Sequence, residues 1–85
     1  MIVNFSTGFK KQHQRLPLSQ QKKLVKQLAY LTADLRHPSL RSRKMAGATK
    51  FEARIDRHYR FTYIINDNEI WLLTIGPHDE GLGKK

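Results

Sequence analysis

The sequence predicts an α+β domain, with an N-terminal strand followed by a helical hairpin packed on a small twisted antiparallel sheet. The first observation is the order of patterns along the chain: a short apolar stretch, two stretches of helical periodicity, then three or four stretches of strand character. The second is that most strand-forming residues fall between positions 51 and 80. The third is length, because 85 residues make one domain, residues 1–85.

The N-terminal part is expected to contain a strand and a short helix. Residues 2–5 are apolar enough for a strand, and either Ser6 or Thr7 can cap the helix that follows. Helical spacing predicts that this helix covers residues 7–15, and Pro17 ends it because proline lacks an amide hydrogen. The residues at this spacing are Phe9, His13 and Leu16.

The second helix has the clearest periodicity in the chain. Ser19 is its expected cap, with Leu18 placed as a hydrophobic staple, and the helix stops before Pro38. Gln27 falls on the side opposite the apolar stripe and is expected to face solvent. The stripe should form the core, and it consists of Leu24, Leu28, Leu31 and Leu35, widened by Val25 and Ala29.

The C-terminal half is expected to supply most of the sheet. Alternation of apolar and polar residues predicts a half-buried strand at residues 51–56. Residues 59–66 and 69–75 are rich in Ile, Tyr, Phe, Thr and Trp, which favours two further strands. The Asp-Asn pair at 67–68 predicts a tight hairpin, because both residue types tolerate positive φ. Residues 44–48 could add a short edge strand.

A two-residue loop in this last hairpin would pair Asn66 with Glu69 and place Arg60 opposite Ile75. Both faces would then be largely apolar, so another element must cover at least one of them. One face would hold Arg60, Thr62, Ile64, Trp71, Leu73 and Ile75, and the other would hold Phe61, Tyr63, Ile65, Ile70, Leu72 and Thr74.

The register of the preceding hairpin stays open on the sequence alone. A three-residue loop at 56–58 would set Arg54 opposite Arg60, whereas a two-residue loop would put them on opposite faces. The sheet face away from the helices would be bordered by the basic segments 41–44 and 50–60.

The composition favours a polyanionic partner. Sixteen Lys and Arg residues stand against seven acids, a formal net charge of +9, which favours nucleic acid over a membrane surface. The alternative is a basic, soluble surface without such a partner. The lack of cysteine fits a reducing compartment. The start is unlike a signal peptide and no stretch reaches the ~20 apolar residues of a membrane span, so we expect a cytoplasmic protein.

Several chemistries have no support in the sequence. It has no glycine-rich phosphate loop before a helix and no serine hydrolase or kinase motif. The acids are scattered, which disfavours a two-metal nuclease, and the four histidines lack metal-ligand spacing. We therefore expect no cofactor and no metal.

Cleavage of RNA by its own 2′-hydroxyl needs no metal. It needs a base, an acid and cations around the phosphorus. Histidine transfers protons near neutral pH, and arginine can bind two phosphate oxygens at once. The candidate catalytic residues are Arg60, His78 and Arg54, because the end of the last strand should bring His78 to the corner where Arg60 stands. Arg54 could instead form an ion pair with Asp56 or Glu52.

Other residues could hold the RNA. Tyr59 or Trp71 could stack on a displaced base, although Trp71 and Tyr63 are expected in the core. His78 could instead close a turn on Asp79. The candidate RNA-binding residues are Lys44, Lys50, Arg57, His58 and Arg43, of which His58 has the alternative of a plain exposed loop residue.

Two segments carry recognisable motifs. They are A-R-I-D-R-H-Y-R-F-T-Y-I-I at residues 53–65 and I-W-L-L-T-I-G-P-H-D-E at residues 70–80. With the element order, they resemble the RelE/ParE superfamily of bacterial toxin–antitoxin toxins over nearly the whole chain. The resemblance implies a RelE-like fold. RelE-like members cleave mRNA on the ribosome, whereas ParE-like members inhibit DNA gyrase.

The resemblance also implies roles for particular residues. Arg60 falls where the RelE and YoeB branches carry an arginine that contacts the scissile phosphate. His78 falls where the YoeB branch carries a histidine near its C-terminus. Arg54 and the region of Lys44 and Lys50 match the basic strands that line the RNA channel.

The sequence departs from these branches at two points. The RelE and YoeB branches end with a tyrosine near the active corner, whereas no tyrosine follows Tyr63 here. YoeB-like enzymes use a glutamate before the central strands, and none lies between Asp34 and Glu52. The general base would then be His78, a lysine, or an acid at positions 79–80.

The leading hypothesis is a toxin that cleaves mRNA in the ribosomal A site and is neutralised by an antitoxin with an acidic wrapping segment. Its expected partners are that antitoxin, mRNA and the ribosome, and no membrane. A second hypothesis is a gyrase inhibitor without nuclease activity, which the missing terminal tyrosine supports. A third is a basic RNA-binding module without catalysis.

Overall fold

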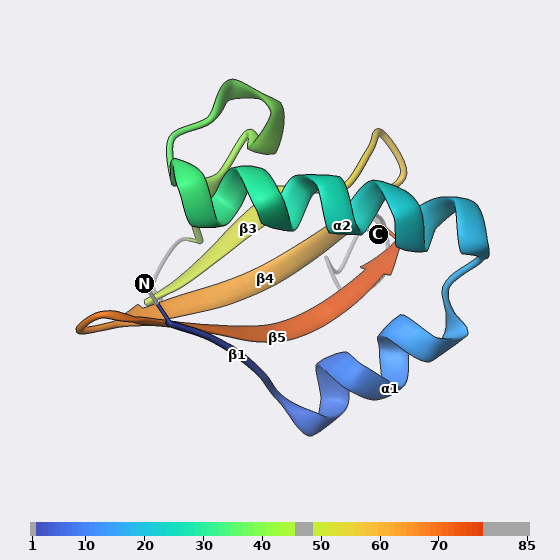
Figure 1. Cartoon of the computed structure of the whole chain (residues 1–85), viewed down its shortest axis with the longest axis horizontal. Helices are drawn as coiled ribbons and strands as arrows, with labels where there is room; N and C mark the ends of the chain where they lie inside the picture. The colour runs from blue at the N-terminus through green and yellow to red at the C-terminus, as the bar shows by residue number, and fades with distance from the viewer. Residues whose placement is uncertain (1, 46–48, 78–85) are drawn as a thin grey trace.

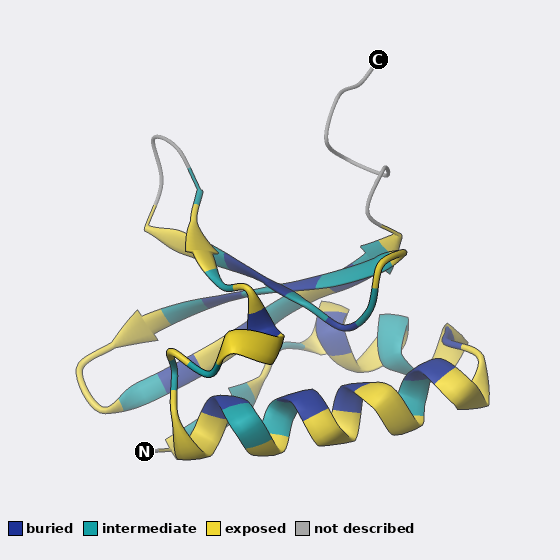
Figure 2. Cartoon of the chain, turned by 90° about the horizontal axis from the view of Figure 1, so that it is seen from above, coloured by how far each residue is buried: buried dark blue, intermediate teal, exposed yellow. Residues whose placement is uncertain are grey.

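Two helices pack against one face of a five-stranded sheet in the computed structural model, which describes residues 2–45 and 49–77 (Figures 1 and 2). The predicted α+β class is confirmed. The elements are β1 (Ile2–Phe5), α1 (Thr7–Arg15), α2 (Leu18–Ala33), the 3-10 helix η1 (Pro38–Leu40), β2 (Arg43–Lys44), β3 (Lys50–Arg54), β4 (Tyr59–Asn66) and β5 (Glu69–Pro77). No helix in this described part of the chain is long and apolar enough to cross a membrane.

The strands lie in the order β1-β5-β4-β3-β2, and the sheet is mixed. The three pairings within β2–β5 are antiparallel, as predicted. β1 instead runs parallel to β5, with Phe5 beside Leu72. The prediction of a wholly antiparallel sheet is wrong at this edge. No tight turn joins β1 to its neighbour, so nothing local in the sequence fixes their relative direction.

The hairpin between β4 and β5 turns at the predicted two residues. Asn66 pairs with Glu69, and Asp67 adopts a positive φ of 56° in the loop. Further along, the register of the two strands shifts: Thr62 pairs with Thr74, but the next residue of β4, Tyr63, pairs with Leu72. One residue of β5 therefore has no partner on β4, which is a β-bulge.

The bulge reverses the predicted faces of the last part of β5. Arg60 lies opposite Gly76, not Ile75 as predicted. Ile75 turns into the core, where it is 4% exposed, and Thr74 moves to the face of Thr62. The assignment of the other strand residues up to Leu72 is unaffected, because it lies on the hairpin side of the shift.

Helix α2 begins one residue before the predicted cap. Pro17 occupies the cap position, and no side chain among the described residues caps the helix, so the prediction that Ser19 is the cap is wrong. Proline fits this position because its fixed φ suits a helix entry and it needs no hydrogen-bond acceptor for an amide.

The buried face of α2 includes two glutamines. Leu24 and Leu31 are buried as predicted, but so is Gln27, whereas Val25 is 63% exposed. The Gln27 Nε2 donates to the carbonyl of Ser39 at 3.0 Å and to that of Arg54 at 2.7 Å. The prediction that Gln27 faces solvent is wrong, because hydrophobic periodicity does not record the buried carbonyls that an amide can satisfy.

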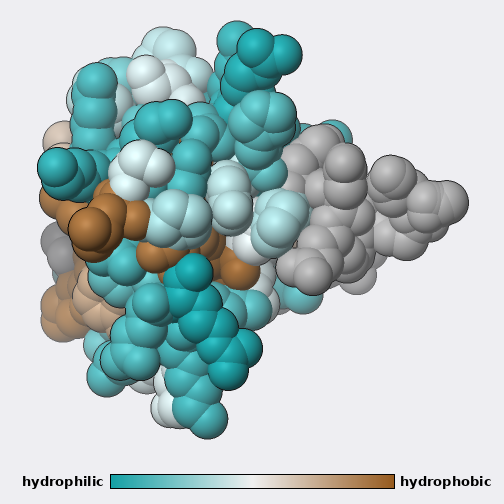
Figure 3. All heavy atoms as spheres, turned by 90° about the vertical axis from the view of Figure 1, so that its right-hand side faces the viewer, coloured by the Kyte–Doolittle hydropathy of each residue, from teal (hydrophilic) through white to brown (hydrophobic). Residues whose placement is uncertain are grey.

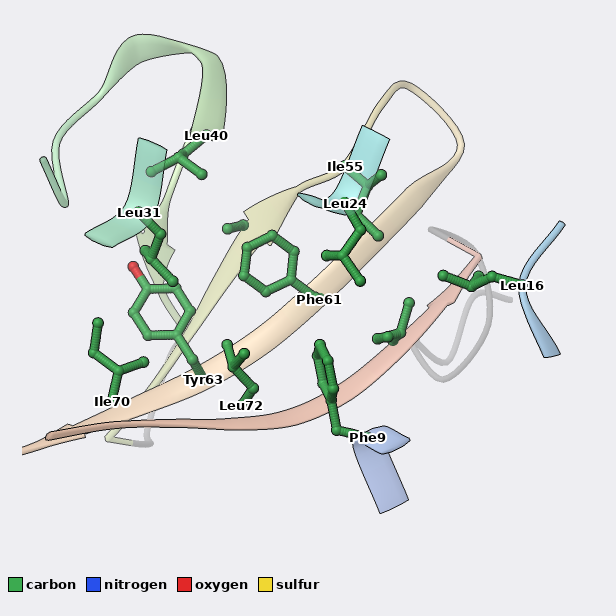
Figure 4. Close-up of a cluster of buried hydrophobic side chains, with 12 residues drawn as sticks. Phe9, Leu16, Leu24, Leu31, Leu40, Ile55, Phe61, Tyr63, Ile70 and Leu72 are labelled. Atoms are coloured by element: carbon green, nitrogen blue, oxygen red, sulfur yellow. The ribbon is translucent and has the colours of Figure 1, made fainter. Parts of the chain in front are cut away.

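The core lies between the helices and the sheet (Figure 4). Tyr63 is buried as predicted, and its hydroxyl donates to the Oγ of Ser42 at 3.0 Å. Burial raises the pKa of this phenol, partly offset by that hydrogen bond. The buried apolar residues are Phe9, Leu16, Leu24, Leu31, Leu40, Ala53, Ile55, Phe61, Tyr63, Ile70, Leu72 and Ile75.

Ser6 caps α1 and ties it to β5. Its Oγ accepts from the amide of Phe9 at 3.1 Å and donates to the carbonyl of Leu73 at 3.1 Å. We expect Ser6→Ala to lower the free energy of unfolding by about 1–2 kcal/mol, measured by urea denaturation. Thr7→Ala, at the exposed alternative cap position, is the control and should change it by about 0.5 kcal/mol or less. Equal effects of the two substitutions would contradict this account.

Candidate functional site

The helices cover one face of the sheet and leave the other uncovered (Figure 2). Two arginines lie opposite each other on the uncovered face. Arg54 in β3 pairs with Arg60 in β4, as the three-residue loop alternative predicted. Arg60 alternates with Phe61, which is buried under the helices, so Arg60 belongs to the opposite face. Gly76, the partner of Arg60 on β5, has no side chain to occupy the space beside it. Since like charges directly opposite destabilise a sheet, this pair favours a bound anion.

The guanidinium of Arg60 is held in place by the backbone. Its Nη1 donates to the carbonyl of Asp56 at 2.7 Å and to that of Tyr59 at 3.1 Å. Burial lowers the pKa of Arg60 and Arg54 lowers it further, while Glu52 and Asp56 act in the opposite direction. A half-buried cation next to a second cation is a suitable site for a phosphate oxygen.

Asp56 anchors the loop that holds Arg60. Its carboxylate accepts from the side chains of Gln20 at 2.9 Å and Lys23 at 3.0 Å, and from the amides of His58 at 2.8 Å and Tyr59 at 3.0 Å. Burial opposes ionisation of Asp56, but these four hydrogen bonds outweigh it and hold the pKa of the carboxyl well below its usual range. The loop is therefore fixed to α2.

Both acids near Arg54 are paired with other residues. Asp56 forms an ion pair with Lys23 at 3.0 Å, and Glu52 forms one with Arg43 at 3.3 Å. Within residues 2–45 and 49–77, Arg54 takes part in no ion pair. The alternative in which Arg54 pairs with Asp56 or Glu52 is therefore wrong in this structure.

A second row of polar residues crosses the same face. Arg43 pairs with Glu52, Glu52 with Thr62, and Thr62 with Thr74. The two threonine hydroxyl oxygens are 2.6 Å apart, and Glu52 is 6% exposed. Sequence reasoning missed this row. Strand alternation could have placed Glu52 on this face, but it gave no sign that the carboxylate is buried.

Trp71 stands on the uncovered face as well. It pairs with Ile64 and with Asn4, and it is 37% exposed. The prediction that Trp71 belongs to the core is wrong, while the same prediction is confirmed for Tyr63. The alternative in which Trp71 stacks on a base is compatible with this position.

The remaining candidate residues that the structure describes fall into three groups. Lys50 and Arg43 share the face of the arginine pair, through their partners on neighbouring strands. Lys44 pairs with Phe51, so it lies on the other face, at the exposed edge of the sheet. Arg57 and His58 are exposed in the β3–β4 loop. His78 lies outside the described residues.

The end of the molecule where β5 and the β3–β4 loop finish is mostly hydrophilic, with a small apolar area (Figure 3). A hollow of about 250 Å³ lies beside the last residues of β5, where Arg15, Tyr59 and Pro77 contribute to its lining. No cluster of three or more His, Asp or Glu side chains that could hold a metal occurs in the part of the chain that the structure describes.

Comparison with known proteins identifies the fold. No protein-family model matches the sequence, and no curated protein sequence matches it. Among solved structures, a copper-bound mutant toxin from Helicobacter pylori matches with a TM-score of 0.79 and 22% identity, over 94% of this chain and 97% of that chain. RelE in the archaeal RelE–RelB complex from Pyrococcus horikoshii matches with a TM-score of 0.78 and 21% identity, over 93% and 96%. A YoeB/ParE toxin from Agrobacterium tumefaciens matches with a TM-score of 0.79 and 14% identity, over 92% and 99%.

The fold is therefore that of the RelE/ParE-type toxins, and the RelE-like architecture predicted from the sequence motifs is confirmed. At these identities the similarity concerns the fold.

Proposed function

We propose that this chain is the toxin of a toxin–antitoxin pair and that it cleaves mRNA at the ribosome. The observation that carries the proposal is the cross-strand pair of Arg54 and Arg60 on the uncovered face. Guanidinium groups keep their charge and bind two phosphate oxygens at once. The net charge of +9 attracts RNA to the surface. The shared fold with RelE-type and YoeB-type toxins supports the same function.

In the proposed reaction, the RNA 2′-oxygen attacks the neighbouring phosphorus and displaces the 5′-oxygen of the next nucleotide. A base takes the proton of the 2′-hydroxyl, and an acid gives a proton to the leaving oxygen, so a 2′,3′-cyclic phosphate and a 5′-hydroxyl result. Arg60 stabilises the charge on the pentacoordinate phosphorus, and Arg54 holds the phosphate beside it. His78, which lies outside the described residues, transfers a proton in this scheme.

Further cations hold the RNA backbone on either side of the cleaved bond. Arg43 and Lys50 share the face of the arginine pair and would contact neighbouring phosphates. Arg57 and His58 would do so from the exposed loop, and Lys44 from the edge of the sheet. These contacts would position the strand and would be sensitive to salt.

Trp71 would stack on one base of the bound strand. We expect Trp71→Ala to weaken binding of a single-stranded 2′-O-methyl RNA by about 10-fold, because stacking of one base contributes roughly 1–3 kcal/mol. Fluorescence anisotropy measures the affinity. Trp71→Phe keeps an aromatic face and should lose less, and Val25→Ala, on the exposed side of α2, should change nothing. Wild-type affinity of Trp71→Ala would contradict the stacking role.

The proposed partner is an antitoxin with an acidic segment. Solved structures of this fold include a YoeB–YefM toxin–antitoxin complex from Staphylococcus aureus and the RelBE toxin–antitoxin complex from Escherichia coli. A basic toxin with a net charge of +9 would be complementary to such a segment. If the acidic segment covered this sheet face, it would keep RNA away from the arginine pair.

Induced expression followed by mapping of mRNA 5′ ends tests the proposal, with and without the product of the neighbouring gene. We expect new 5′-hydroxyl ends within translated regions, and none when the neighbouring product is present. Purified protein with ribosomes should cut programmed mRNA in the presence of EDTA. Inhibited gyrase with intact mRNA would overturn the proposal in favour of a ParE-like inhibitor. RNA binding without toxicity or cleavage would favour a binding module.

A further inference from the structure

Glu52 is a buried acid in the middle of the basic face. On that face it lies between Lys50 and Arg54 along β3, and its partners across the strands are Arg43 and Thr62. Its exposed fraction is 6%. A carboxylate on a surface that binds phosphate repels the ligand, so its presence there needs a physical reason.

Glu52 makes a defined contact with Arg43. The Nε of Arg43 donates to Oε1 of Glu52 at 3.3 Å, and the Nη2 lies 3.3 Å from the same oxygen. Two nitrogens on one edge of the guanidinium therefore face a single oxygen, which fixes the direction of the guanidinium plane. The opposite edge of Arg43 stays available, because the side chain is 70% exposed.

Stability alone gives little reason for this pair. The side chain of Glu52 is 8% exposed while that of Arg43 is 70% exposed. An ion pair with so exposed a partner stabilises a protein little, whereas burial of the carboxylate is unfavourable. A neutral side chain at position 52 would avoid this burial.

Glu52 also acts on the arginine pair. Its charge opposes the effects of Arg54 and Arg43 on Arg60, whose guanidinium is half-buried beside them. The carboxylate therefore reduces the repulsion among three guanidinium groups on one face. Without it, the most exposed of the three, Arg43, has the greatest freedom to turn towards solvent.

We propose that Glu52 is a positioning residue for RNA cleavage, which holds Arg43 beside the Arg54–Arg60 pair so that neighbouring phosphates of one RNA strand are bound in register. This role rests on the proposed function. Glu52 acts through Arg43 and transfers no proton. The ligand of the combined site is a single-stranded RNA segment with at least two consecutive phosphates.

Glu52→Gln distinguishes a positioning role of Glu52 from a purely electrostatic one. Loss of a negative charge alone should favour RNA binding, whereas loss of positioning should slow cleavage. The substitution removes one negative charge at nearly constant shape. Non-cleavable 2′-O-methyl RNA should bind at least as tightly as to wild type, because the surface becomes more positive. Single-turnover cleavage of ribosome-bound mRNA should nevertheless slow by about 10- to 100-fold, because the scissile phosphate is held less accurately. Cleavage at the wild-type rate would overturn the proposal.

A double-mutant cycle with Arg43 shows whether Glu52 acts through that residue. Arg43→Ala should slow cleavage at least as much as Glu52→Gln. Adding Glu52→Gln to Arg43→Ala should then cause no further loss. Losses that simply add would show that Glu52 acts independently of Arg43, and would overturn the proposed route.

A measurement without RNA distinguishes failure of this inference from failure of the proposed function. In NMR spectra of ¹⁵N-labelled protein, the Nε–H of Arg43 should give a signal that exchanges slowly with water in wild type and faster in Glu52→Gln. Unchanged exchange in Glu52→Gln would overturn the positioning role whatever the activity. Changed exchange in a protein that cleaves no RNA would instead overturn the proposed function, and with it any role in cleavage. Far-UV circular dichroism checks that the variant is folded.

Discussion

Arg60→Ala is expected to slow mRNA cleavage by about 100- to 1,000-fold, the loss typical of removing one preorganised group that stabilises a transition-state charge. The guanidinium of Arg60 is oriented before RNA arrives, since the carbonyls of Asp56 and Tyr59 both accept from its Nη1. Arg54, directly opposite, would still attract the phosphate. Within residues 2–45 and 49–77, no backbone carbonyl orients the Arg54 guanidinium in this way, so Arg54 would not replace Arg60 at the phosphorus.

Single-turnover kinetics with programmed ribosomes measures this effect. Arg60→Lys keeps the charge but loses the paired donors, so it should recover only part of the rate. Lys26→Ala removes one positive charge from an exposed position on α2, across the molecule from the uncovered face, and should leave the rate near that of wild type. Similar losses in Arg60→Ala and Lys26→Ala would mean that only net charge matters, which would contradict a specific role of Arg60.

The elements that the sequence predicts well depend on local features. β1, α1 and β4 have the predicted bounds. Ser6 caps α1 by accepting a hydrogen bond from the amide of Phe9, three residues later, and Pro17 ends the helix because of its covalent geometry. The turn at Asp67 follows from the tolerance of that residue type for positive φ. Each of these causes acts within four residues, so it can be read from the sequence.

The features that the sequence does not predict depend on distant partners. In β5, the carbonyl of Leu73 in the bulged segment accepts from Ser6, and the amide of Ile75 donates to Gln12 at 2.7 Å. Both partners come from the N-terminal end of the chain, more than 60 residues away. Strict alternation along β5 therefore predicts the wrong sheet face for the residues beyond Leu72. The same reasoning explains Gln27, whose acceptors lie on η1 and β3.

The sequence predicts some features of the candidate site and not others. Residue types alone identified Arg54 and Arg60 as a possible phosphate site, and the hairpin register then brought them together. Lys44 has the positive charge that binds phosphate, but it is adjacent to Arg43 on β2, and adjacent residues of a strand lie on different faces of the sheet. The importance of Glu52 comes from its burial and from its contact with Arg43, and neither is visible in the composition.

Asp56→Ala is expected to lower the free energy of unfolding by about 3 kcal/mol, a large part of the roughly 5–15 kcal/mol of a small domain. The substitution leaves four donors without their acceptor, and Gln20 among them is 9% exposed. Asp56→Asn keeps one oxygen that can accept from the amides of His58 and Tyr59, so it should lose less. Urea denaturation at neutral pH measures both changes. Equal stability of Asp56→Ala and wild type would contradict the anchoring role.

The pH dependence of the free energy of unfolding shows whether the charge of Asp56 stabilises the fold. Because the pKa of Asp56 is lower in the folded protein than its ordinary value of about 3.9, ionisation stabilises the fold. The stabilisation is fully present above that value and is lost as the pH falls towards the lower folded-state pKa. The stability difference between wild type and Asp56→Asn should therefore be constant between about pH 5 and 7 and shrink below about pH 4. A difference as large at pH 3 as at pH 7 would contradict this assignment.

The same substitution connects stability to the proposed activity. Asp56 fixes the β3–β4 loop through its carboxylate, while its backbone carbonyl accepts from Arg60. If the loop loosens in Asp56→Ala, the orientation of Arg60 is lost even at temperatures where the protein stays folded. We therefore expect folded Asp56→Ala to cleave mRNA more slowly than Asp56→Asn, which keeps the amide contacts. Lys23→Ala removes only the exposed ion pair and should leave the rate almost unchanged.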